Sequence, residues 1–282
     1  MLVISLTSIP SRFARLPQRL RSLMAQQVPD LRVELYIPRR YRRFPEHDGS
    51  LPEVPPGVAL HVVEDDLGPA SKVLFAARRH RGQDVDILYC DDDVDYLPDW
   101  APRLLTARKR LPRAAIAART RMLEGMGVAA RADRPQPHAR LRKRALDFRY
   151  AGGMLVQALR HGGRSRIPPE QRPARDWLSR SGYADVAEGI GGVLIRPDFL
   201  DDAAFDPPPE FFAVDDIWLS GHLARRGIPI WGEQGASRFR LMDEHRDADP
   251  LWNATIAGVG RLQADRACIA HFRETYGVWP AA

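Results

Sequence analysis

The sequence of 282 residues contains little cysteine, little lysine and no long apolar run. Its two cysteines, Cys90 and Cys268, are too few for a disulfide framework and fit a reducing compartment such as the cytosol. A membrane-spanning helix needs about 18 or more apolar residues in succession, and no segment reaches that length. The start, Met1–Leu6, lacks a basic leading region, so we interpret it as a first strand and not as a secretion signal. These absences favour a globular cytoplasmic protein.

Positive charge is abundant but unevenly distributed. The net charge is +6, and only three of the 42 basic residues are lysines. Segment 131–149 holds seven Lys or Arg against Asp133 and Asp147. A nucleic-acid interface interleaves aromatic side chains with its basic ones, whereas Phe148 is the only aromatic residue of this segment. We therefore expect no nucleic-acid partner. An anionic sugar acceptor, or peripheral contact of segment 131–149 with the inner face of a membrane, stays open.

Short β-rich runs alternate with helical stretches along the chain, which predicts an α/β fold with a mostly parallel central sheet flanked by helices. The Arg- and Pro-rich middle, 124–182, has no such pattern, so we expect loops or mobile elements there. The expected strands are 2–6, 33–37, 58–63, 85–90, 114–118, 189–196 and 228–231, and the expected helices are 16–27, 71–79, 100–110 and 215–226, with weak helical periodicity over 251–276.

Three consecutive carboxylates, Asp91–Asp93, follow the apolar run of residues 86–90. Crowded like charges cost free energy unless a cation compensates them. The end of a buried strand places them at the carboxyl edge of the sheet, where open α/β folds bind ligands. Carboxylate oxygens suit a hard divalent ion such as Mg²⁺ or Mn²⁺. We expect Asp91 and Asp93 to hold the metal and Asp91 and Asp92 to lie at a bound diphosphate. An acidic loop or a helix cap is the structural alternative.

A second acidic pair, Asp215-Asp216, begins the predicted helix 215–226. Carboxylates at a helix start interact favourably with the helix dipole, so capping is one explanation. The other makes one of them, Asp216 in preference to Asp215, a general base for an acceptor hydroxyl. The aromatic residues nearby, including Trp218, would then form a stacking wall for a sugar. The glycine-led strand 189–196 either lets a ligand approach the backbone or makes a tight turn into the core.

Polar residues also follow the first and third predicted strands. Thr7 and Arg12 come after the first, and Asp65 and Lys72 come after the third. In a parallel sheet they lie at the same edge as Asp91–Asp93. Polar groups there are candidates to bind a nucleobase and ribose, and Arg12 or Lys72 to bind phosphate oxygens.

These motifs resemble those of GT-A glycosyltransferases. Asp91–Asp93 resembles the Asp-X-Asp motif that holds Mn²⁺ or Mg²⁺ on a nucleotide-diphospho-sugar, and Val214–Asp216 resembles the later acidic motif, usually Glu-Asp. Gly191–Arg196 resembles the acceptor-side strand of family-2-like transferases, Leu67–Lys72 is similar to a segment of a bacterial transferase group, and Asp91–Val94 resembles exostosin-type domains. The resemblance covers residues 1–125 and 187–232.

The resemblance implies a single GT-A (Rossmann-like) domain over 1–282. Residues 1–125 would bind the nucleotide-sugar, a UDP-sugar, and residues 126–282 the acceptor, with a basic, loop-rich insertion at about 131–175. The acceptor would be a hydroxyl of a glycan or glycoconjugate in cell-surface polysaccharide assembly. The Asp-Asp pair leaves inversion and retention of configuration open. Many GT-A enzymes take a metal ligand from a C-terminal histidine, which would be His245 or His271 here.

Two other classes of protein stay open. A sugar-nucleotidyltransferase shares the sheet and the metal but carries a glycine-rich phosphate loop after the first strand, and Thr7–Arg12 contains no glycine. A non-catalytic carbohydrate-binding or scaffold protein needs neither acidic cluster.

Overall fold

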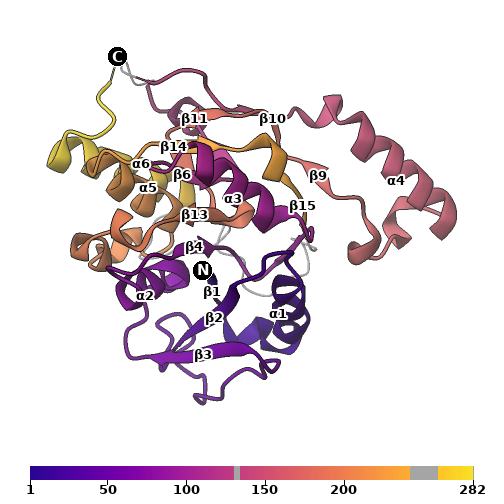
Figure 1. The fold of residues 1–282 in the computed structure, drawn as a ribbon, viewed down its shortest axis with the longest axis horizontal. Coiled ribbons are helices and arrows are strands. Elements are labelled where there is room, and N and C mark those ends of the chain that lie inside the picture. Colours follow the sequence, from indigo (N-terminus) through magenta and orange to yellow (C-terminus); the bar gives the residue numbers. More distant parts are fainter. Residues whose placement is uncertain (130–133, 242–259, 282) are drawn as a thin grey trace.

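Eight strands form the central sheet of the computed structural model, which describes residues 1–129, 134–241 and 260–281 (Figure 1). Apolar strand residues alternate between the two faces, and both faces are covered by helices. The strands lie in the order β11 (Gly182–Ala184), β14 (Ile230–Gly232), β6 (Ala115–Ala117), β13 (Val193–Ile195), β4 (Asp86–Tyr89), β1 (Leu2–Thr7), β2 (Leu31–Pro38) and β3 (Val58–Val63).

Parallel pairing dominates this sheet, as the alternating sequence pattern predicts. The pairs β1–β2, β1–β4, β2–β3 and β6–β14 are parallel. Strand β13 runs antiparallel to both β4 and β6, with Val193 opposite Tyr89. An antiparallel strand can enter a sheet without a crossover helix, so β13 can follow the long middle segment directly. The residues just before β13 therefore meet the carboxyl ends of β4 and β1.

Two apolar cores sandwich the sheet. Leu88 of β4 points into the core formed with α1 (Leu16–Met24) and α3 (Trp100–Arg110). Its neighbours Ile87 and Tyr89 point into the opposite core, formed with α2 (Ser71–Arg79) and α5 (Asp215–Arg225). This alternation follows from the two-residue period of a strand.

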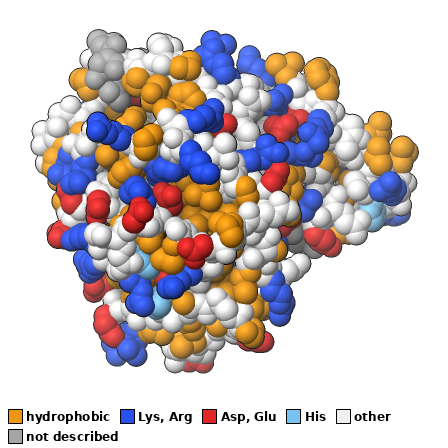
Figure 2. Space-filling view, in the orientation of Figure 1, with side chains coloured by type: hydrophobic (Ala, Val, Ile, Leu, Met, Phe, Trp, Pro, Cys, Tyr) orange, Lys and Arg blue, Asp and Glu red, His pale blue; other side chains and the backbone are white. Residues whose placement is uncertain are grey.

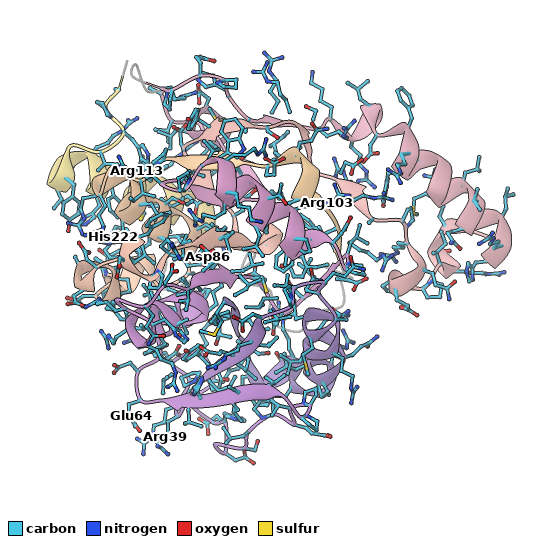
Figure 3. All side chains as sticks on the ribbon, in the orientation of Figure 1. Arg39, Glu64, Asp86, Arg103, Arg113 and His222 are labelled. Carbon is cyan, nitrogen blue, oxygen red and sulfur yellow. The ribbon has the colours of Figure 1, made fainter. Side chains whose placement is uncertain are left out.

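A third core lies between α5 and α6 (Arg261–Tyr276), where Trp218, Phe272 and Cys268 are buried. His222 of α5, labelled in Figure 3, lies 4.5 Å from the Trp218 ring, measured between centroids. Burial, followed by the charge of Arg225, lowers the pKa of His222 to about 4. His222 is therefore a neutral packing residue at physiological pH.

Residues 140–173, called the arm below, project from this body (Figure 1). The arm begins at β8 (Arg140–Leu141), which pairs with β10 (Leu178–Arg180), and contains α4 (Phe148–His161). It returns to the body through β9 (Arg175–Asp176), which pairs with β15 (Arg238–Leu241), and β15 pairs with β5 (Val94–Tyr96). Strands β7 (Thr120–Arg121) and β12 (Val186–Ala187) form a separate two-stranded antiparallel sheet.

Helix α4 corrects the expectation of loops over 124–182, since Phe148–His161 form a regular helix within that range. Gly152 and Gly153 lie inside this helix, and each disfavours helix by about 1 kcal/mol relative to alanine, which obscured it in the sequence. Its ends have ordinary signals, since Asp147 accepts a hydrogen bond from the Tyr150 amide and Gly162 takes a left-handed conformation.

The other predicted elements lie close to their expected positions. Strand 58–63 and helices 71–79 and 100–110 have the predicted bounds. The expected strand 189–196 is shorter, because Gly189–Gly191 form a tight 3-10 turn before β13. Among the described helices, none combines the length and the apolar character that crossing a bilayer requires.

Candidate active site

A cavity of about 500 Å³ opens at the carboxyl ends of β1, β2 and β4. The parallel pairing of these strands brings their following segments together, and the reversed β13 adds the turn at Gly189. Residues from both acidic motifs line the cavity, together with residues that follow strands β1 and β3. The cavity lining includes Thr7, Ser8, Arg12, Asp66, Lys72, Asp91, Asp92, Asp93, Arg119, Arg121, Glu188, Asp215, Asp216, Arg261 and Asp265.

The three carboxylates of Asp91–Asp93 have different surroundings. The Asp92 side chain is only 5% exposed; it accepts hydrogen bonds from the Ser8 hydroxyl and, at 2.6 Å, from the Arg12 guanidinium. Asp91 and Asp93 are 30% and 26% exposed and face the cavity. Lys72 Nζ lies 2.6 Å from Asp91 Oδ1, and Arg12 lies 3.2 Å from Asp93 Oδ2. Lys72 and Arg12 thus offset the repulsion within the cluster, and Asp92 anchors it.

Lys72 joins the two acidic motifs. Its buried ammonium lies 2.6 Å from Asp91 and 2.8 Å from Asp215, which is itself buried. Burial lowers the pKa of Lys72, but the carboxylates of Asp215 and Asp91 outweigh this and hold that pKa well above the usual lysine range. Burial raises the pKa of Asp215 to about 6, against the opposing effect of Lys72. Lys72 therefore stays charged and holds the two motifs at one side of the cavity.

Asp216 differs from its neighbour in position. It is half-buried, lines the cavity and accepts a hydrogen bond of 2.8 Å from the Gly189 amide. A Cβ atom at residue 189 would collide with Lys72 and approach Asp216. The glycine-led segment thus lets the backbone reach these two side chains and orients the Asp216 carboxylate.

Two stacked aromatic residues hold the Gly189–Gly191 turn in place through hydrogen bonds to its carbonyl groups. The rings of Tyr96 and Trp100 stack with centroids 4.0 Å apart. The Tyr96 hydroxyl donates to the Ile190 carbonyl at 3.0 Å, and Trp100 Nε1 donates to the Gly191 carbonyl at 2.9 Å. Gly192 has a φ of +84°, and a side chain there would overlap the Trp100 ring. These contacts explain why a tight glycine turn precedes β13.

A second set of ion pairs also lines the cavity. Buried Glu188 lies 2.8 Å from Arg119 and 2.9 Å from Arg121, and Arg121 lies 3.6 Å from Asp265 of α6. Burial raises the pKa of Glu188, opposed by these two arginines. Arg119 also lies over the Trp177 ring, 4.3 Å from its centroid. No sequence pattern marks these residues, because single arginines are common in so Arg-rich a chain.

Two predicted site residues, which lie at or just after the ends of strands β1 and β3, have surroundings that the sequence did not indicate. Asp65 is exposed and lies outside the cavity lining, whereas its neighbour Asp66 points inward and accepts hydrogen bonds from the Arg42 and Gly68 amides. Adjacent residues of a turn point in different directions, so the motif identified the segment but not the side chain. Thr7 lines the cavity, but its hydroxyl donates to the Tyr36 carbonyl at 2.7 Å.

Among the described residues, the predicted site residues Trp218 and His271 do not reach the cavity. Trp218 is buried, and its Nε1 donates to the Ala204 carbonyl, so it belongs to the core; Phe212 is the aromatic residue of that motif that lines the cavity. His271 packs against the Phe211 and Trp218 rings and lies outside the lining. His245 lies outside the described residues.

The cavity offers oxygen ligands for a divalent ion, namely the partly exposed carboxylates of Asp91 and Asp93. In the described part of the chain, no group of three or more His, Cys, Asp or Glu side chains is arranged to hold a metal. Mg²⁺, however, is commonly bound by one or two carboxylates together with substrate phosphates. The lining has six Lys or Arg and eight Asp or Glu residues, a formal surplus of two negative charges. Two carboxylates with phosphate oxygens therefore fit a divalent ion in this cavity.

No protein-family model and no curated protein matches the chain. Among solved structures it is similar to residues 1–349 of TarS from S. aureus (12% identity, 86% of this chain, 60% of that one, TM-score 0.44). It is also similar to the mannosyltransferase PcManGT from Pyrobaculum calidifontis in complex with GDP-Man and Mn²⁺ (12%, 87%, 58%, TM-score 0.47). A mycobacterial protein matches over the whole chain (14%, 76% of that protein, TM-score 0.47). The chain spans about 60% of the length of the first two.

Proposed function

We propose that this protein is a metal-dependent glycosyltransferase that moves a sugar from a nucleotide-diphospho-sugar to a hydroxyl of a glycan or glycoconjugate. The observation that carries the proposal is the single cavity in which Lys72 bridges Asp91 and Asp215, members of two acidic motifs far apart in the chain. By resemblance, the donor is a UDP-sugar and the process is cell-surface polysaccharide assembly at the cytoplasmic face of a membrane. Residues 1–125 would bind the donor and residues 126–282 the acceptor.

In this proposal the donor diphosphate lies between Arg12, Asp91 and Asp93. A divalent ion on the carboxylates of Asp91 and Asp93 would neutralise the charge that develops on the departing diphosphate. Arg12 lies beside Asp92 and Asp93 and would donate hydrogen bonds to phosphate oxygens. Buried Asp92 holds Arg12 and Ser8 in position, and the segments at Thr7 and Asp66 supply polar groups for the nucleoside.

Asp216 is the better candidate for the general base. It lines the cavity and is oriented by the Gly189 amide, whereas Asp215 is buried against Lys72. Asp216 would take the proton from the acceptor hydroxyl while the hydroxyl oxygen bonds to the anomeric carbon. The bond between that carbon and the phosphate oxygen then breaks, and the nucleoside diphosphate leaves with the bonding electron pair. This displacement inverts the anomeric configuration, which NMR of the product checks directly.

A panel of nucleotide-sugars, incubated with the protein, Mn²⁺ and simple glycan acceptors, tests the proposal through nucleoside diphosphate release. Asp93→Asn and Asp216→Asn should each reduce turnover by about 100-fold or more, because each removes a charge needed at the reacting centre. Asp99→Asn is the matched control, since Asp99 is exposed, pairs with Arg103 and lies outside the lining. Equal turnover in all four proteins would refute the assignment.

The same assay separates the two alternative classes. A sugar-nucleotidyltransferase would release pyrophosphate from a nucleoside triphosphate and a sugar phosphate. A carbohydrate-binding protein would retain its glycan in both variants and release nothing.

A further inference from the structure

The arm displays large apolar side chains on its surface. Among the described residues, six of the eleven exposed large hydrophobic side chains fall within it, and Phe148 and Leu159 are 77% and 76% exposed. None of the residues of α4 is buried. Such a cluster is unusual on a soluble surface and marks a place of contact. The six residues are Leu141, Leu146, Phe148, Leu155, Val156 and Leu159.

The exposed apolar side chains of α4 form a stripe along one side of the helix. Phe148, Gly152, Leu155 and Leu159 are spaced three and four residues apart, which places them on one face. The other face packs on the returning chain: a Cβ atom at Gly153 would lie 3.0 Å from Pro173, and His161 hydrogen-bonds Gln171 at 2.8 Å. The stripe therefore points away from the arm's own support.

The charge of the arm is predominantly positive. Its residues 140–173 contain nine Lys or Arg and two acidic residues, Asp147, which is buried, and Glu170, which is exposed. Arg149 and Arg160 lie on α4 itself and are exposed. Figure 2 shows orange and blue side chains together on the arm at the edge of the molecule. The remaining basic residues are Arg140, Arg142, Lys143, Arg144, Arg164, Arg166 and Arg172.

We propose that the arm docks on the surface of an anionic lipid bilayer, with α4 lying in the interfacial plane. A helix with an apolar stripe and flanking arginines inserts its stripe between acyl chains while its cations meet anionic headgroups. A second copy of the chain would bring like charge against like charge. A nucleic acid would neutralise the arginines but leave Leu155, Leu159 and Phe148 in water.

The arm is connected to the wall of the cavity. β9 at its base pairs with β15, which pairs with β5 directly after Asp91–Asp93. Trp177, just beyond β9, lies under Arg175 at 4.5 Å and under Arg119 at 4.3 Å, and Arg119 lines the cavity. An arm held on a bilayer would thus keep the cavity close to the lipid surface, within reach of a lipid-linked substrate.

Vesicle cosedimentation of the full chain tests the proposal without any measurement of catalysis. The protein should bind phosphatidylcholine vesicles that contain phosphatidylglycerol and should bind pure phosphatidylcholine vesicles at least about tenfold more weakly. Leu155→Glu/Leu159→Glu should lower the first affinity by about tenfold or more, because the stripe can no longer enter the acyl region. Leu51→Glu, at a leucine that is 49% exposed outside the arm, is the matched control and should bind like the parent.

A second variant, Arg149→Glu/Arg160→Glu, tests the electrostatic part and should also lose binding, while added salt should weaken the parent. Both variants change exposed residues, and circular dichroism melts should match the parent. The proposal is overturned if the parent binds neither vesicle, or if the leucine variant binds as well as the parent. It is also overturned if the parent does not bind vesicles and instead forms a dimer that is lost in the leucine variant. None of these results bears on whether the cavity transfers sugars.

Discussion

The cavity and the arm are both rich in arginine, but they use it differently. In the cavity Arg12, Arg119 and Arg121 lie within 3.6 Å of carboxylates that come from distant parts of the chain. The arm, residues 140–173, has nine basic residues against two acids, buried Asp147 and exposed Glu170. Charged side chains that are paired in a concave, half-buried site have fixed orientations, which suits the binding of a small charged ligand. Charges of one sign in solvent have no fixed partner and suit an extended surface of opposite sign.

Replacing one lysine in each region gives the largest expected contrast. Lys72→Met would leave Asp91 and Asp215 without their shared cation in a buried setting, at a cost of about 4 kcal/mol in the free energy of unfolding. Lys143→Met, at an exposed position of the arm, should change it by less than about 0.5 kcal/mol. Urea unfolding of the three proteins measures both values. Equal changes in the free energy of unfolding would contradict this contrast between the two regions, since they would mean that Lys72 contributes no more to stability than a surface residue.

Glycine replacements give the next largest contrast. Gly192→Ala forces a left-handed backbone and a collision with Trp100, and should destabilise the protein by about 3 kcal/mol. Gly152→Ala adds a methyl group to an exposed helix position with nothing within 4 Å, and should stabilise α4 by about 1 kcal/mol. Thermal melts report the first change, and hydrogen exchange of the α4 amides reports the second. Destabilisation by Gly152→Ala would contradict a helical arm.

The same two regions show what the sequence could and could not predict. The cavity lies where strand ends and polar motifs coincide, so Asp91–Asp93, Asp216, Lys72 and Arg12 could be located from the chain alone. Asp65 lies outside the cavity lining whereas Asp66 lines it, and the sequence could not show this because it depends on side-chain direction in a turn. The contacts of Glu188 with Arg119 and Arg121 are purely tertiary. Helix α4 was missed because its glycine pair weakens the helical signal, and packing on the returning chain supports it.

The last predicted effect is a pH dependence in the cavity. Because the pKa of Asp215 is raised above its unfolded value of 3.8 to about 6, its contribution to stability is fully present below pH 3.8 and is lost as pH rises through about 6. Asp215→Asn removes this titration. The free energy of unfolding of the variant relative to the parent should therefore rise between pH 4 and pH 7. A difference that stays flat across this range would show that Asp215 titrates normally.

Calorimetric titration of nucleoside diphosphates tests the central claim most directly. If the cavity binds the donor through a cation on Asp91 and Asp93, at least one nucleoside diphosphate should bind the parent saturably in Mn²⁺. That binding should disappear in EDTA and in Asp91→Asn/Asp93→Asn. No binding of any nucleoside diphosphate to the parent in Mn²⁺, or equal binding by the double variant, would contradict it.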